Sequence, residues 1–301
     1  MRFPLVLAAR ALLCAAGALA AFPSLGQSRP DARHFLWEVV SMTNRAYLFG
    51  TIHAGKKEWY PLPPAIEDAL GASEVLVVEA DINDVVAMSK TTDTMAYKPP
   101  DELAKHVPPA DYERFRQQLA RFGAQEAGVK NLKPFTAVSL LIFGEWARMG
   151  YQPQYGVDSY LLRKARAERK TVVEIEGVEA QAKLMDSLTE EDHRKVFAGT
   201  LAALESGLTG EQIEGMVKAW QIGDAFLMLE VARRYNEKVP GAAELEEKFV
   251  WSRHEAMLAK IEGYLNKSRE RHFIAVGSLH LTGKRGLVEM LRARGYLVRQ
   301  L

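Results

Sequence analysis

Cysteine is almost absent from this chain of 301 residues, and Cys14 is the only one. It lies in an N-terminal stretch with the features of a leader, so disulfide bonds and thiolate metal sites are excluded for the rest of the chain. Any metal site there has to use His, Asp or Glu. A local motif such as His-Glu-x-x-His is also missing, so metal ligands would have to come from segments that are distant in sequence.

An excess of either charge and a long apolar run are lacking as well. The chain has 39 Lys and Arg against 38 Asp and Glu. Nucleic-acid-binding proteins usually carry a clear basic excess, so we expect no nucleic-acid partner. The apolar stretch from Ala11 to Phe22 is too short to cross a bilayer comfortably.

Residues 1–26 resemble a bacterial secretory signal peptide. Arg2 makes the start basic, an apolar stretch follows, and small residues precede candidate cleavage points after Ala20 or Gly26. We therefore expect a periplasmic or secreted protein without a stable membrane span after cleavage; an uncleaved signal would anchor it to the membrane. Residues 1–26 contain Arg2 and Arg10 but no acidic residue, so their removal changes the formal charge from +1 to −1. Residues 27–301 are expected to form a single domain.

Apolar, strand-like runs alternate with helical patterns along the chain. A short polar segment separates the first two runs and predicts a hairpin. The predicted strands lie at 35–40, 46–53, 73–82, 171–177, 272–280 and 296–301. Helical patterns fill about 100–169 and 178–268 and are expected to form insertions. Together they predict an α/β fold with a mixed, largely parallel central sheet, flanking helices and a large helical cap.

Aromatic residues and methionines recur at helical intervals in these insertions. They are Phe135, Phe143, Trp146, Trp220 and Met228. We interpret them mainly as core residues, because an apolar stripe at helical spacing is typical of a packed face. The alternative is that some of them line a substrate cleft.

Chemically reactive residues follow four of the predicted strands. Two strand ends carry Gly-x-x-His and two carry a carboxylate; the residues are Gly50, His53, Glu79, Glu176, Gly277 and His280. Ligands bind beyond the carboxyl ends of parallel strands, so these side chains are expected to meet. Two imidazoles and two carboxylates suit a divalent Mn, Fe, Co or Zn ion. A single histidine after a strand is more often structural, but the repeated pattern favours a shared site.

Three stretches together resemble the TraB/GumN family. They are "LWEV…AYLFGTIHAG…YPLPPAIEDALGASEVLVVEAD", "YGVDSYLLRKARAERKTVVEIEGVEAQ" and "FIAVGSLHLTGKRGLVEMLRARGYLV". The resemblance covers nearly all of residues 27–301. The family includes the TIKI proteins, described as divalent-metal-dependent proteases that favour manganese or cobalt, and is related to haem-binding ChaN-like and to erythromycin-esterase-like proteins. It implies an α/β fold that carries both Gly-x-x-His motifs.

The resemblance also implies roles for individual residues. His53, Glu79 and His280 correspond to metal ligands, with Gly50 and Gly277 opening the two motifs. Glu176 is expected to act as the general base and Arg253 to stabilise an oxyanion. Asp158, in the "GVD" stretch, is either a carboxylate of a helix start or a site residue. The family commonly has Arg-Asn where this chain has Arg253-His254, so His254 either adds a ligand or faces solvent.

The expected function is therefore metal-dependent hydrolysis of a peptide or a small-molecule substrate. The expected cofactor is a divalent ion of Mn, Co, Fe or Zn. Two alternatives stay open: a non-catalytic periplasmic protein that binds haem or another ligand, since histidine also ligates haem iron, and an accessory factor for conjugation or polysaccharide export.

Overall fold

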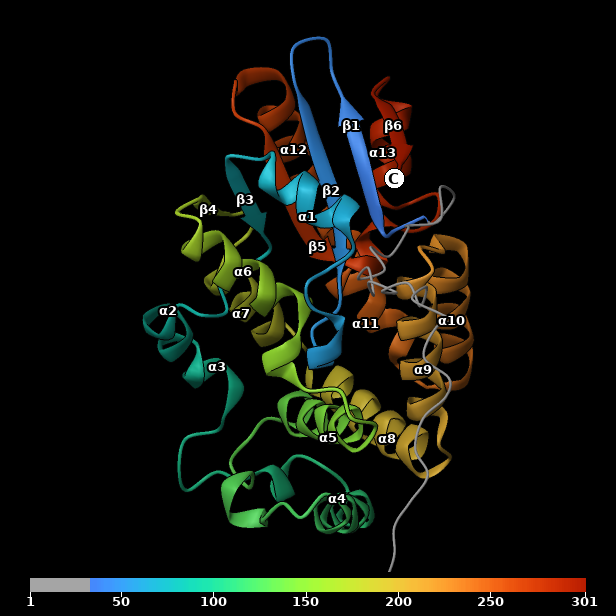
Figure 1. Cartoon of the computed structure of the whole chain (residues 1–301). Coiled ribbons are helices and arrows are strands. Elements are labelled where there is room, and N and C mark those ends of the chain that lie inside the picture. Colours follow the sequence, from blue (N-terminus) through green and yellow to red (C-terminus); the bar gives the residue numbers. More distant parts are fainter. Residues whose placement is uncertain (1–32) are drawn as a thin grey trace, which may run out of the picture. The chain divides into compact units, whose positions relative to one another are not determined.

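The computed structural model describes residues 33–301, and the expected signal peptide lies outside them. Six strands in this part of the chain form one sheet in the order β4-β3-β5-β2-β1-β6 (Figure 1). The strands are β1 Leu36–Val40, β2 Arg45–Thr51, β3 Val75–Val78, β4 Thr171–Glu174, β5 His272–Gly277 and β6 Leu297–Gln300.

Strands β4, β3, β5 and β2 run parallel, whereas β1 is antiparallel to both β2 and β6. The predicted hairpin, the terminal strand and the mixed, largely parallel sheet are confirmed. β2 pairs with β5 so that Thr51 faces Gly277 at the carboxyl ends. The two Gly-x-x-His segments, near opposite ends of the sequence, therefore leave the sheet side by side.

The central strands are buried because helices cover the sheet on both faces. All residues of β3 are buried, as are all of β2 except Arg45. Helices α1 (Pro64–Gly71), α6 (Val157–Ala167), α12 (His254–Lys267) and α13 (Leu287–Ala293) contribute residues to this core. Figure 1 shows α1 in front of the sheet and α12 and α13 behind it. Burial on both faces explains why these strands are continuous apolar runs.

Helices α6 and α12 fall within the expected insertions but pack on the sheet. The remaining α-helices lie beyond the carboxyl ends of the parallel strands (Figure 1). They comprise α2 Val85–Lys90, α3 Thr92–Met95, α4 Pro109–Arg121, α5 Pro134–Arg148, α7 Val178–Asp186, α8 Glu190–Glu205, α9 Leu208–Gln221, α10 Ala225–Lys238 and α11 Ala242–Phe249. Helices α4, α5 and α8 share a second core around Phe115, Leu141 and Phe197. No helix between residues 33 and 301 has the length and apolar character needed to span a membrane.

Local sequence signals determine where several of these helices begin. Proline occupies the first helical position of α1, α4 and α5, where the missing N–H has no partner to lose. Helix α8 begins with a capping box. The hydroxyl of Thr189 accepts a hydrogen bond from the N–H of Asp192, and the Asp192 carboxylate accepts from the N–H of Thr189. Lys248 of α11 donates to the same carboxylate at 2.5 Å, which joins α11 to α8.

Candidate functional site

The residues predicted at strand ends lie just beyond the strands. Glu79 follows β3 directly, whereas His53 and Glu176 each come two residues after their strand. His280 lies in the 3₁₀ helix η6, Ser278–Leu281, because the predicted strand 272–280 ends at Gly277. The Ser278 hydroxyl donates to the carbonyl oxygen of Thr51 at 2.8 Å, so this helical turn is held against the end of β2.

Glu79 and Glu176 lie next to each other because backbone pairing continues past the ends of β3 and β4. The N–H groups of Glu176 and Gly177 donate to the carbonyl oxygen of Glu79 at 3.1 and 2.9 Å. Gly177 then opens helix α7 with φ = 97°, a conformation that favours glycine. The chain therefore leaves the edge of the sheet immediately after Glu176.

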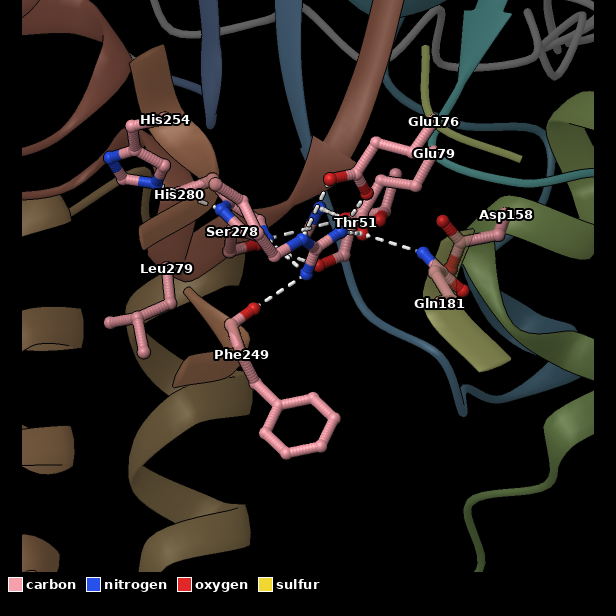
Figure 2. Close-up of polar contacts among 12 residues, drawn as sticks. Thr51, Glu79, Asp158, Glu176, Gln181, Phe249, His254, Ser278, Leu279 and His280 are labelled. Atoms are coloured by element: carbon pink, nitrogen blue, oxygen red, sulfur yellow. Dashed lines mark hydrogen bonds and ion pairs between the residues drawn. The ribbon is translucent and has the colours of Figure 1, made fainter. Parts of the chain in front are cut away.

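Arg253 binds Glu79 and Glu176, whose carboxylates lie close together in Figure 2. Its Nε donates to Glu176 at 2.9 Å, and Nη2 donates to Glu79 at 2.5 Å and to the second oxygen of Glu176. Nη1 donates to the carbonyl oxygen of Phe249 at 2.5 Å. The arginine belongs to a 3₁₀ turn, Trp251–Arg253, just before α12. The three side chains are 13–14% exposed, so this ion-pair cluster is largely desolvated.

The glycines of the two motifs permit close approach. Gly277 donates its N–H to Glu79 at 2.6 Å, and a Cβ at this position would lie 3.3 Å from the same oxygen. A Cβ on Gly50 would lie 2.5 Å from the Phe35 ring, too close for any side chain. Gly50 therefore requires glycine, whereas a Cβ at Gly277 would press on the Glu79 carboxylate by a few tenths of an ångström.

His280 is buried between the ion-pair cluster and a second histidine. Its Nε2 is 3.6 Å from Oε1 of Glu79 and 3.3 Å from Nη1 of Arg253. Its Nδ1 is 2.9 Å from Nε2 of His254, whose Nδ1 is 2.6 Å from the carbonyl oxygen of Arg285. His254 is buried, so of the two alternatives for this residue, a ligand or a solvent-facing side chain, the second is wrong.

His53 pairs with Asp158 through Nδ1 at 2.8 Å. Asp158 lies in the first turn of α6 but does not cap it, because its carboxylate is directed to the histidine. Gly156, the N-cap residue of α6, would place a Cβ 2.3 Å from the carbonyl oxygen of His53, so only glycine fits there. Because Asp158 engages Nδ1 of His53, the other ring nitrogen, Nε2, is available to bind a proton, a substrate or a metal ion.

Charge and burial set the protonation states of the cluster. Burial lowers the pKa of His280 to about 3, so the ring is neutral near pH 7. Burial alone would raise the pKa of Glu79, but the positive charge around it, chiefly Arg253 once His280 is neutral, holds the pKa below its usual value. The negative charge of Asp158 raises the pKa of His53, and water at its 67% exposed side chain screens part of this effect.

These groups line one cavity of about 480 Å³. The ionic groups are His53, Glu79, Asp158, Arg253 and His280. The walls are largely apolar and come from α5, α7, α9 and α11, including Phe143, Trp146, Met185, Met216 and Phe249. The interpretation of Phe143 as a core residue is therefore wrong, since it is 40% exposed and lines the cavity, whereas Trp220 and Met228 are buried in the main core.

Two further groups in this lining have no signal in the sequence. The hydroxyl of Thr51 is buried and has no hydrogen-bond partner in the part of the chain that the structure describes. Gln181 of α7 donates to Glu79 at 3.2 Å. Threonine inside a strand and glutamine on a helix are too common to stand out, so only the fold reveals both.

Fold and site together define an α/β protein with an imidazole, carboxylate and arginine cluster at the carboxyl edge of a parallel sheet, beneath apolar helical walls. The model of the TraB/PrgY/gumN family matches residues 35–300, and the chain belongs to that family.

Individual relatives span the same region. The uncharacterized protein YbaP of Escherichia coli (strain K12) is 26% identical over 86% of this chain and 94% of its own length. The Metalloprotease TIKI homolog of Amphimedon queenslandica is 25% identical over 89% of this chain and 61% of its own length. Metalloprotease TIKI2 of Xenopus tropicalis is 23% identical, again over 61% of its own length. No solved structure matches this chain.

Proposed function

We propose that this chain is an exported, divalent-metal-dependent hydrolase of the peptidase type. The observation that carries the proposal is that His280, Glu79, Arg253 and the His53–Asp158 pair line one cavity, with Glu176 held by Arg253. Similarity to proteins named metalloproteases supports hydrolysis as the reaction class. Export rests on the signal-like residues 1–26, and sequencing the N-terminus of the protein from a periplasmic fraction tests it.

The donor chemistry fits a divalent ion. Nε2 of His280 and Oε1 of Glu79 are 3.6 Å apart, which is close to the spacing of about 3.4 Å for two tetrahedral ligands of one ion. We assign His53 as the third ligand, because its Nδ1 is held by Asp158 in the way a metal-bound imidazole is oriented. Within residues 33–301 no three such side chains are arranged to hold an ion, so binding would require these side chains to move. When bound, it would polarise a carbonyl and acidify water.

The surrounding residues have distinct roles in the proposal. Glu176 takes the proton of the attacking water, because each of its oxygens keeps a second lone pair while Arg253 holds the carboxylate in place. The Arg253 N–H that faces His280 is assigned to the oxygen that becomes negative in the transition state. Gln181, already bonded to Glu79, can turn its amide to a peptide group of the substrate.

The apolar walls favour a substrate with a large apolar group next to the hydrolysed bond. A peptide with an aromatic or long aliphatic side chain has this character, and a pocket of this volume holds one such side chain with its flanking backbone. Haem is less favoured, since Nε2 of His280 faces Glu79 and Arg253, and a macrocycle would have to cover these charges.

The test is a peptide-library cleavage assay with added Mn²⁺, Co²⁺, Fe²⁺ or Zn²⁺, run beside the H53A/H280A double variant. Metal-dependent cleavage by the wild type alone is expected. Equal activity in both preparations would mean a contaminating enzyme or another centre. Elemental analysis and an absorption spectrum separate the alternatives: a Soret band lost on His53→Ala would indicate haem, and no metal at saturating ion would favour an accessory role.

A further inference from the structure

His254 is a buried histidine whose ring lies beside His280 (Figure 2). Its other ring nitrogen contacts the carbonyl oxygen of Arg285. His254 and His280 are 2% and 4% exposed, so protein groups rather than bulk water supply their hydrogen-bond partners. The contacts on both sides of this histidine pair therefore decide which ring nitrogens carry protons.

The partner at the first end is an acceptor only. A carbonyl oxygen cannot donate, so Nδ1 of His254 carries the proton that it shares with Arg285. The neutral ring then has its lone pair on Nε2. The 2.9 Å contact with His280 is a hydrogen bond when His280 donates from Nδ1–H.

The partner at the second end is a donor only. Nη1 of Arg253 lies 3.3 Å from Nε2 of His280, and a guanidinium has no acceptor. This nitrogen must therefore carry a lone pair. If His254 were doubly protonated, its Nε2–H would need a lone pair on Nδ1 of His280. The proton of His280 would then be on Nε2 and would face the N–H of Arg253. The contacts with Arg285 and with Arg253 thus both require His280 to carry its proton on Nδ1 and its lone pair on Nε2.

We propose that His254 is a positioning residue that fixes His280 in the Nδ1–H tautomer and keeps the Nε2 lone pair directed toward Arg253 and the cavity. The assignment of this lone pair to a metal ion rests on the proposed function, whereas the tautomer itself does not. Hydrogen bonds that orient a metal-binding imidazole typically change metal affinity 10- to 100-fold when removed.

Replacement of His254 by leucine removes the acceptor at little change in volume. Nδ1–H of His280 would then be a buried donor without a partner, which is unfavourable. The carboxylate of Glu79, 3.6 Å from Nε2, is an acceptor that the ring still faces. The proton therefore moves to Nε2, and the lone pair no longer points into the cavity.

The experiment is long-range ¹H–¹⁵N NMR of the full chain labelled at its seven histidines, in metal-free buffer at pH 7.5. His280→Gln assigns the His280 signals. We expect Nδ1–H in the wild type and Nε2–H, or a mixture, in His254→Leu. His254→Gln places an amide oxygen near the position of Nε2 and restores the wild-type tautomer. Nε2–H in the wild type, or no change in His254→Leu, would overturn the proposal.

His272→Leu is the matched control. His272 is also buried, 4% exposed, and its Nδ1 donates to the carbonyl oxygen of Glu270 at 2.9 Å, but it lies at the other end of β5. Loss of a buried histidine there lowers stability without changing the tautomer of His280. Co²⁺ titration is expected to show 10- to 100-fold weaker binding for His254→Leu and wild-type affinity for His254→Gln and His272→Leu.

The two measurements separate the two proposals. The expected tautomers without Co²⁺ binding by the wild type would support the positioning role and refute the metal-dependent function. A changed tautomer in His254→Leu with unchanged Co²⁺ affinity would refute the role of His254 in orienting the metal ligand.

Discussion

Replacement of Arg253 by methionine tests whether the ion-pair cluster is a desolvated unit. The change keeps much of the side-chain volume but removes the cation that binds Glu79 and Glu176. The three side chains are 13–14% exposed, so the remaining carboxylates cannot be fully hydrated. Leaving a buried charge without its partner costs about 3–5 kcal/mol, and we expect the free energy of unfolding to fall by that amount.

Arg116→Met is the matched control. Arg116 also binds two glutamates, Glu113 and Glu126, each at 2.9 Å, but these side chains are 42–57% exposed. Exposed pairs contribute about 0–1 kcal/mol, so this variant should be almost as stable as the wild type. In both clusters one arginine binds two glutamates, so comparison of the two variants tests the effect of burial.

Urea unfolding followed by circular dichroism, with a chelator present, measures both variants. The triple variant Glu79→Gln/Arg253→Met/Glu176→Gln should recover at least half of the loss, because no buried charge remains. Without Arg253 the pKa of at least one glutamate rises in the folded state, so stability falls as pH rises above its ordinary value near 4.5 and the deficit is larger at pH 8 than at pH 5. A loss no larger than that of Arg116→Met, or no recovery in the triple variant, would refute the reasoning.

Three other substitutions test separate parts of the structure. Gly156→Ala should lower stability by more than about 2 kcal/mol and shift the NMR signals of His53, because the new Cβ would lie 2.3 Å from a carbonyl oxygen; an unchanged spectrum contradicts this. Phe143→Ala should raise KM for apolar peptides several-fold with under about 1 kcal/mol lost in urea unfolding, since the side chain is 40% exposed; unchanged KM would remove it from the substrate site. Asp192→Ala should cost about 1–2 kcal/mol at pH 7 through loss of the cap of α8. Burial would raise the pKa of Asp192, but Lys248 and the cap lower it to about 2, so this contribution is present above pH 3.8 and about half lost at pH 3; a cost independent of pH would contradict it.

Sequence alone predicted the elements because their signals are local. Continuous apolar runs indicated strands buried on both faces, and the hairpin, the terminal strand and the largely parallel sheet are all present. Parallel strands share one carboxyl edge, so the residues after them could be expected to come together. His53, Glu79 and His280 line one cavity as this topology requires.

Tertiary structure alone decided which side chains pair. Arg253 binds Glu176, 77 positions earlier in the chain, and His254 contacts His280, 26 positions later. No periodicity encodes these contacts, because they depend on how α11 and α12 pack beside the sheet. Phe143 lies on an apolar helix whose pattern is the same for a core and for a cavity wall. Periodicity reports which face of an element is apolar, whereas what covers that face is determined by packing through space.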